Sequence, residues 1–383
     1  MNKKEVLEIR KQFTPANCAI TRICGCYVDH EKEKKFESKE AFLALPEEEA
    51  FKYFDIFRHT LAGTIGKNLM NMAFPLEQEQ AGGTQEFLIR LRDSKLKDDT
   101  LLDEFYDKVI NSYEYDENYF IILIHSVYDI PGRSSDGLEM YDASEDVYDH
   151  ILCSICPVNL TKAGLSYNIE KNNIEDRVRD WLVEGPVKGF LFPAFNDRNV
   201  DIHEVLYYSK KAEDLQPVFI EEVLGSELPL TADTQKETFH AIVTDTLGED
   251  CDYEVVKNIH ETLNEMIEES KDNPEPLVLT KPDVKRVLAS SGVDNEKLEY
   301  FDQQYEQKVG ENTPLLAANI AETKKFNIET PDVIIKVNPN RADLVETRII
   351  DNRQCLVIAV DDHIEVNGVN VKTLKMMQEE DGE

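Results

Sequence analysis

Basic residues are scarce in this chain. Its 383 residues include 42 lysines and arginines against 76 aspartates and glutamates, so the formal net charge is −34. Non-specific binding to nucleic acid depends on lysine and arginine side chains that neutralise phosphates. The sequence contains no conspicuous run of basic residues that could form a local phosphate-binding patch. The composition therefore argues against direct binding of DNA.

The sequence also lacks long apolar segments. No run approaches the roughly eighteen apolar residues that a membrane span requires. The first ten residues are charged and contain no apolar core of a signal peptide. The seven cysteines are odd in number and spread along the chain, a pattern typical of free thiols in a reducing compartment. These absences predict a cytoplasmic protein that makes no membrane contact.

The most apolar stretch of the chain is residues 119–125, with the sequence Tyr-Phe-Ile-Ile-Leu-Ile-His. A short apolar run bounded by polar residues is typical of a strand buried on both faces, so we expect a central strand here. Further apolar, β-favouring segments predict strands at residues 19–28, 86–91, 151–158 and 187–195. Helices are expected at residues 174–183, which carry the only tryptophan, and at 201–208, 214–224 and 233–246.

This pattern predicts an α+β protein. We expect a mixed or antiparallel sheet with flanking helices, and a smaller C-terminal domain of helices and β-hairpins. The best boundary lies at residues 272–276, where two prolines in a polar stretch prevent the preceding helix from continuing. The expected parts are a main domain at 1–271, with its sheet at about 19–195 and a helical part at about 200–271, a C-terminal domain at 277–374, and a frayed tail at 375–383.

Four cysteines form the first candidate metal site. Cys24, Cys26, Cys153 and Cys156 could supply the four thiolates of a tetrahedral zinc site. In strands, however, Cys24 and Cys26 would share a face, whereas Cys153 and Cys156 would point to opposite faces. We therefore interpret these residues as buried structural thiols, and zinc binding is the alternative.

A second candidate group is Asp361, Asp362 and His363, which lie between two expected strands. Carboxylates beside a histidine could bind a metal ion or transfer protons, although the same residues are also typical of turns. The segment from His260 to Asn264 lacks the second histidine of the zinc-protease motif. No catalytic residue and no cofactor site are predicted.

The opening residues carry a family resemblance. The segments Met1-Asn-Lys-Lys-Glu-Val-Leu-Glu-Ile-Arg-Lys-Gln-Phe-Thr-Pro15 and Cys18-Ala-Ile-Thr-Arg-Ile-Cys-Gly-Cys-Tyr-Val-Asp29 closely resemble a bacterial family defined as a domain of unknown function, family 4317. The resemblance extends over nearly the whole chain. It implies a bacterial protein and assigns no activity.

A second, more distant resemblance involves the middle of the chain. Val205-Leu-Tyr-Tyr-Ser-Lys-Lys211, followed by Val218-Phe-Ile-Glu-Glu-Val-Leu-Gly225, is similar to paired motifs of the nucleoid-associated NdpA-like proteins. The later segment Val333-Ile-Ile-Lys-Val-Asn338 keeps the same order, so the similarity extends over about 85–370. It implies association with the bacterial nucleoid and carries over no catalytic residue.

These observations favour a non-enzymatic cytoplasmic protein that is nucleoid-associated or acts through protein contacts. Because of the acidic charge, we expect a protein partner rather than direct contact with DNA. Two alternatives remain open. One is a metal-dependent enzyme that uses the cysteine pairs or the Asp361 group, and the other is an acidic mimic of nucleic acid.

Overall fold

The computed structural model divides the chain into two units. It describes residues 1–133, 139–140, 146–248, 251–310, 313–360 and 363–371. The first unit comprises Met1–Gln235 and Asn273–Pro276, and the second comprises Lys236–Asp272 and Leu277–Glu383. The sequence-based division kept residues 236–271 with the sheet, whereas the structure places them in the second unit. The expected frayed tail lies outside the described residues.

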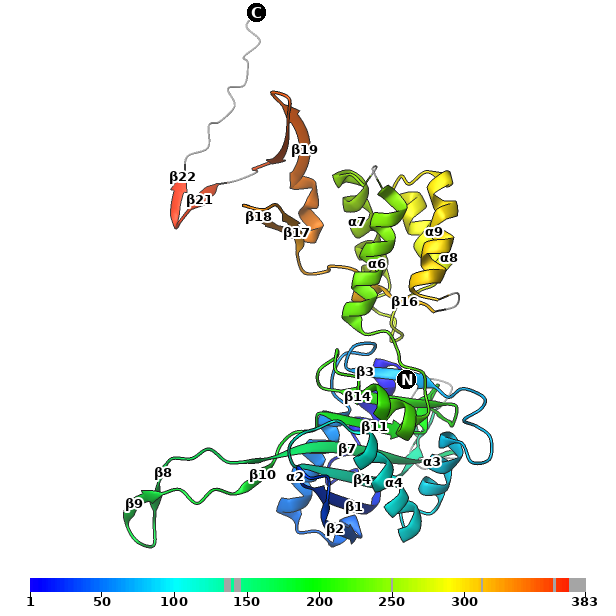
Figure 1. Ribbon diagram of the computed structural model, residues 1–383, viewed down its shortest axis with the longest axis vertical. Helices are drawn as coiled ribbons and strands as arrows, with labels where there is room; N and C mark the ends of the chain where they lie inside the picture. Colours follow the sequence, from blue (N-terminus) through cyan, green and yellow to red (C-terminus); the bar gives the residue numbers. More distant parts are fainter. Residues whose placement is uncertain (134–138, 141–145, 249–250, 311–312, 361–362, 372–383) are drawn as a thin grey trace, which may run out of the picture. The chain divides into compact units, whose positions relative to one another are not determined.

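An antiparallel sheet forms the centre of the first unit (Figure 1). In spatial order its strands are β2 (Lys34–Glu40), β1 (Ile20–Val28), β4 (Tyr119–Ile130), β7 (Asp146–Leu160), β11 (Lys188–Phe192), β14 (Glu204–Ser209) and β3 (Leu69–Ala73), and β10 (Trp181–Val183) also pairs with β7. Of the two sheet types expected from the sequence, the antiparallel one is present. The expected central strand is confirmed, because β4 lies between β1 and β7.

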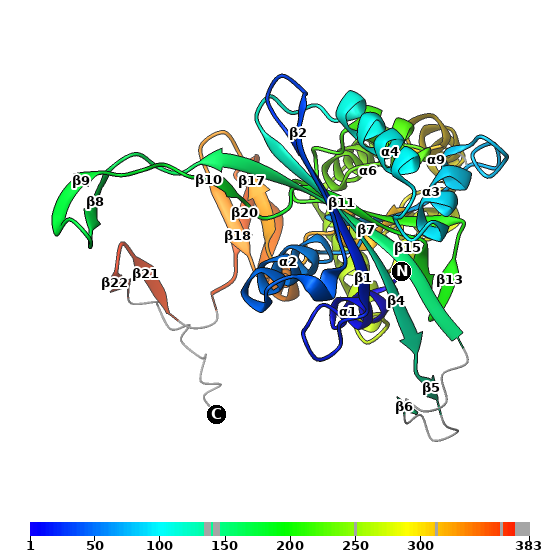
Figure 2. The same ribbon diagram turned by 90° about the horizontal axis from the view of Figure 1, so that it is seen from below.

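Helices cover both faces of this sheet (Figures 1 and 2). Successive residues of a strand point to opposite faces. Along β4, Ile121 and Leu123 accordingly join one apolar core, and Ile122 and Ile124 join the other. The first core includes α3 (Thr84–Asp93), α4 (Asp99–Ser112), α5 (Pro217–Phe219) and its continuation η3 (Ile220–Leu224), and the second includes α1 (Lys3–Arg10), η1 (Phe42–Ala44) and α2 (Glu47–Thr60).

Three sequence-based expectations about single elements are wrong. Residues 86–91 belong to α3 rather than to a strand, since a short apolar run fits either a helix face or a strand. Residues 201–208 were expected to form a helix, but β14 begins at Glu204 and pairs with β11 and β3. Residues 174–183 were also expected to be helical, and they contain β9 (Asn173–Asp176) and β10 instead.

Small hairpins complete the first unit. They are β5 (Gly132–Arg133) with β6 (Glu139–Met140), β8 (Leu165–Asn168) with β9, and β12 (Ala194–Asn196) with β13 (Asn199–Asp201). Among the described residues of the whole chain, no helix is long and apolar enough to cross a membrane.

The second unit is a set of helices followed by β-hairpins. Its helices are α6 (Ala232–Leu247), which begins in the first unit, α7 (Tyr253–Glu269), α8 (Lys281–Ser290), α9 (Asn295–Lys308), α10 (Ala317–Ile320) and η5 (Pro339–Leu344). Its paired strands are β15 (Val278–Leu279) with β16 (Leu315–Leu316), β17 (Phe326–Glu329) with β18 (Ile334–Val337), β19 (Val345–Ile350) with β20 (Arg353–Ile358), and β21 (Ile364–Val366) with β22 (Val369–Val371). Asn367 and Gly368 form the turn that connects β21 and β22, as is typical of a two-residue hairpin.

Local capping explains where several helices begin. Asn2 and Glu5 form a capping box at α1, the side chain of Asp98 caps α4, and that of Asp252 caps α7. Oδ1 of Asn2, of Asp98 and of Asp252 each accepts a hydrogen bond from a backbone N–H of the first turn that has no partner within the helix.

Candidate functional site

The four cysteines that could have bound zinc are buried in β1 and β7, which lie on either side of β4. Cys24, Cys26 and Cys153 face one core, whereas Cys156 faces the other, so the sheet separates it from the rest. Burial raises the pKa of all four thiols, that of Cys26 to about 12. Zinc binds the thiolate form, and these environments favour the neutral thiol, which packs as a small apolar side chain.

The other candidate group falls only partly within the described residues. Asp361 and Asp362 lie outside them, and His363 is exposed immediately before β21. The structure therefore gives no geometry for these three residues as a set.

In the part of the chain that the structure describes, one acidic cluster has oxygens close enough to share a cation. Asp29, Glu31 and Glu33 form it at the turn between β1 and β2. Oδ1 of Asp29 accepts hydrogen bonds from the backbone N–H groups of Glu31 at 3.0 Å and Glu33 at 2.9 Å, and Nζ of Lys35 lies 3.0 Å from Oδ2 of Asp29. Such bonds are typical of an aspartate-initiated turn, so the turn accounts for the cluster.

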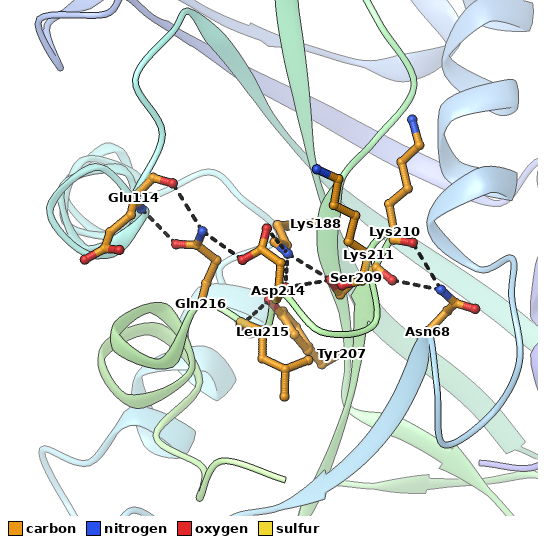
Figure 3. A network of polar contacts seen from close by, with 10 residues as sticks. All are labelled: Asn68, Glu114, Lys188, Tyr207, Ser209, Lys210, Lys211, Asp214, Leu215 and Gln216. Atoms are coloured by element: carbon orange, nitrogen blue, oxygen red, sulfur yellow. Dashed lines mark hydrogen bonds and ion pairs between the residues drawn. The ribbon is translucent and has the colours of Figure 1, made fainter. Parts of the chain in front are cut away.

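A polar network surrounds the buried Lys188 at the start of β11 (Figure 3). The residue is 2% exposed. Its ammonium group donates to Oγ of Ser209 at 2.8 Å and to the carbonyl of Asp214, and it lies 3.0 Å from Oδ2 of Asp214. Burial lowers the pKa of Lys188, and the carboxylate of Asp214 opposes that shift by stabilising the charged form.

This network does not have the arrangement of a serine–lysine nucleophile pair. In such a pair a neutral lysine accepts the serine proton. Here three acceptor atoms match the three protons of a charged ammonium group. The hydroxyl of Ser209 lies in donor geometry 2.6 Å from the carbonyl of Lys211 and 2.8 Å from that of Asp214. The serine proton is therefore directed at backbone carbonyls.

The network instead holds the connection between β14 and α5 in place. The hydroxyl of Tyr207 donates to the carbonyl of Leu215 at 2.8 Å. The side chain of Gln216 accepts from the backbone N–H of Glu114 at 2.9 Å and donates to its carbonyl at 3.2 Å, which ties the connection to the end of α4 (Figure 3). Tyr207 and Ser209 of β14 thus have a structural role here.

A second polar group lies where β1, β4 and β7 adjoin. The register between β1 and β4 shifts at Thr21, a bulge that re-aims its side chain. Oγ1 of Thr21 lies 2.6 Å from Nδ1 of His125, whose Nε2 lies 2.6 Å from Oδ1 of Asp149. Burial raises the pKa of Asp149, but His125 and Arg92 more than offset this, so its pKa is below the ordinary value. Oγ1 of Thr21 also lies 3.2 Å from the His125 carbonyl, which closes the bulge.

The feature of the first unit with the clearest potential for binding is a β-arm, residues 161–183, which continues from β7 and returns through β10 (Figures 1 and 2). Its tip is the β8–β9 hairpin. Backbone bonds from Thr161 N to Asp180 O at 2.9 Å and from Arg177 N to Gly164 O at 2.8 Å connect the two limbs between base and tip. The arm is therefore a paired, ordered ribbon.

The tip hairpin has one apolar face and one polar face. Residues opposite each other in an antiparallel pair share a face. Tyr167 lies opposite Ile174, and Leu165 lies opposite Asp176, so three apolar side chains and one carboxylate share a face. Leu165 is 76% exposed, Tyr167 is 56% exposed and Ile174 is 57% exposed. The apolar face is thus open to solvent.

On the polar face of the tip, the side chains form hydrogen bonds and an ion pair within the hairpin itself. Oδ1 of Asn168 accepts hydrogen bonds from the backbone N–H groups of Glu170 and Lys171, and Nζ of Lys171 lies 3.0 Å from Glu175. Further apolar side chains of the arm are also exposed, namely Ile169, Val178, Trp181, Leu182 and Val183. The sequence analysis missed this feature because it assigned residues 174–183 to a helix.

Charge also distinguishes the arm from the rest of the chain. Residues 161–183 contain four basic residues (Lys162, Lys171, Arg177 and Arg179) and four acidic ones (Glu170, Glu175, Asp176 and Asp180), so their net charge is zero. The whole chain carries −34. The arm is therefore an extension without net charge, and with an exposed apolar face at its tip, of a strongly acidic protein.

The fold is thus that of an α+β protein with an antiparallel sheet covered by helices on both faces. The chain belongs to the family described as Domain of unknown function (DUF4317), which matches residues 1–369. This confirms the family membership expected from residues 1–29. A comparison with curated proteins found no match.

Proposed function

We propose that this protein is a non-enzymatic binding protein whose β-arm docks onto another protein. The observation that carries the proposal is the open apolar face of the tip hairpin, formed by Leu165, Tyr167 and Ile174. A two-stranded hairpin alone is marginally stable in water, and contiguous exposed apolar groups mark interaction sites. A partner that covers this face would supply the core that the arm lacks.

The charge of the chain supports a basic partner. A second copy would bring another −34 charges, which repel the first at long range. A basic protein is attracted instead, and the neutral arm lets apolar surfaces meet without local repulsion. Asp176, the charged residue on the apolar face of the tip, offers such a partner one carboxylate. The partner would thus have an apolar groove with cationic groups beside it.

A basic partner also fits a nucleoid-associated role in the cytoplasm. Proteins that coat DNA are basic, because they neutralise phosphates. The similarity of residues 205–211 and 218–225 to nucleoid-associated proteins supports the same role. In this proposal the acidic chain reaches DNA indirectly, through the bound protein.

Affinity capture from the native host tests the proposal. The tagged full chain should retain a basic protein after nuclease treatment, and DNA only when that protein is present. The variant Leu165→Asp/Ile174→Asp should weaken capture at least tenfold, because each substitution places a charge in the apolar contact, at about 1–3 kcal/mol each. Both residues are exposed, so the fold should persist.

The matched control is Ser166→Asp/Asn173→Asp. These residues lie in the same two strands, on the polar face, and the control adds the same charge. Capture should be nearly unchanged. Equal loss in both variants, or capture of DNA by the isolated chain, would contradict the proposal. Stoichiometric zinc in the purified protein would favour the metal-dependent enzyme instead.

A further inference from the structure

A cleft in the second unit concentrates positive charge in this acidic chain. It has a volume of about 370 Å³ and lies between α7 and the segments that flank the β17–β18 hairpin. Lys324 and Lys325 come from the segment before β17, and Lys336 from β18. Because Asn327 pairs with Lys336, the hairpin brings these separate segments together.

The positive charge of the cleft is not neutralised by neighbouring carboxylates. Among the described residues, no carboxylate lies within ion-pair distance of the three ammonium groups. Glu268, which lines the cleft, lies 3.1 Å from Nζ of Lys271, and Glu322 is paired with Lys236. Charges beyond about 8 Å are largely screened at physiological salt. The local excess therefore outweighs the distant acidic surface.

The remaining lining of the cleft offers hydrogen bonds. Asn264, Thr323, Asn338 and Asn340 contribute polar side chains. The Nδ2 group of Asn264 lies 3.5 Å from the carbonyl of Glu322, and its buried Oδ1 has no hydrogen-bond partner. A buried polar atom is normally satisfied by protein, water or a ligand. A hydroxyl or amino group of a bound molecule could donate to this oxygen.

We propose that this cleft binds the phosphate groups of a small phosphorylated molecule of about nucleotide size. Lysine is a common ligand of phosphate oxygens, and a volume of about 370 Å³ lies at the lower end of small-molecule sites. A short diphosphate can contact three lysines, whereas an extended nucleic acid would also meet the acidic surface outside the cleft. The ligand class is therefore a nucleoside diphosphate or a related phosphate ester.

Isothermal titration calorimetry on the full chain tests this inference. Adenosine diphosphate and inorganic pyrophosphate should both bind, and more weakly as salt increases. The variant Lys324→Gln/Lys336→Gln removes one cation from the segment before β17 and one from β18. It should weaken binding roughly tenfold per lysine, the size of one charge-assisted hydrogen bond. A short single-stranded oligonucleotide should bind more weakly than adenosine diphosphate.

The matched control is Lys52→Gln/Lys67→Gln, two exposed lysines of the first unit, which should leave affinity unchanged. Unchanged unfolding midpoints would show that both variants fold. No heat with either small probe, equal loss in the control, or tighter binding of the oligonucleotide would each overturn the inference. The arm variant Leu165→Asp/Ile174→Asp should bind adenosine diphosphate normally, so this result is separate from the proposed arm contact.

Discussion

The strand β7 and the arm that continues from it have opposite surroundings. From Ile151 to Val158, the apolar side chains of β7 are at most 3% exposed, and helices cover both faces of the sheet there. A few residues further on, Leu165 is 76% exposed. Both segments are apolar and both are paired as β-structure. Apolar content therefore predicts a strand, but it does not tell whether this chain or another molecule covers it.

The difference between β7 and the arm is tested most directly by truncating a leucine side chain in each region. Leu152→Ala in β7 should lower the free energy of unfolding by about 2–5 kcal/mol, because it leaves a cavity in a closed core. Leu165→Ala should change it by less than about 0.5 kcal/mol. Denaturant unfolding followed by far-UV circular dichroism measures both. Similar losses at the two positions would mean that the arm is packed within its own chain.

A smaller effect is expected from a buried histidine in the covered part of β7. His150 is fully buried, and its ring stacks on Tyr148 at 4.3 Å. Burial lowers the pKa of His150 to about 4. Between about pH 6.5 and 4 the unfolded chain binds a proton that the folded chain does not, so stability falls as pH falls. The variant His150→Phe should remove up to about 3 kcal/mol of this pH dependence.

The exposed His203 provides the control for the sign of that effect. A hydrogen bond to Glu79 raises the pKa of His203, so its contribution to stability is present at low pH and is lost as pH rises. His203→Gln should therefore change the pH dependence weakly and in the opposite direction. An unfolding free energy of His150→Phe that falls with acid as steeply as that of the unmodified chain would contradict the assignment.

The smallest expected effect concerns Trp181 in β10, the only tryptophan of the chain. Its side chain is 58% exposed where the arm leaves the sheet. The indole is in contact with water both before and after unfolding, so its emission maximum should shift little in denaturant while circular dichroism is lost. A large red shift on unfolding would show that the base of the arm is buried in solution.

Much of the sheet could be predicted from the sequence. The run at 119–125 has six apolar residues between polar ones, and it forms the buried part of β4. The opposite orientations of Cys153 and Cys156 follow from the two-residue period of a strand, and their side chains do lie in different cores. Where one strong pattern decides the structure, reasoning from the residues was sufficient.

The errors arose where local pattern and tertiary context compete. Residues 86–91 are apolar enough for a strand, but they follow Gly83 and pack as one face of α3. The returning limb of the arm, residues 174–183, contains two short strands. Each is too short for the two-residue period of a strand to be recognised in the sequence. The lysines of the cleft lie in separate segments, so no basic run marks them. Such sites depend on which segments pair, which composition does not reveal.

The continuity of β7 also has a mechanical consequence. It is one strand from Asp146 to Leu160. It pairs with β4 and β11 in the sheet, and its last residues pair with β10 at the base of the arm. A pulling force on the arm is transmitted along the covalent backbone into the middle of the sheet. There the load acts parallel to the strand and is shared by many backbone hydrogen bonds at once. The arm is thus anchored in a strand that is hydrogen-bonded to neighbours on both sides.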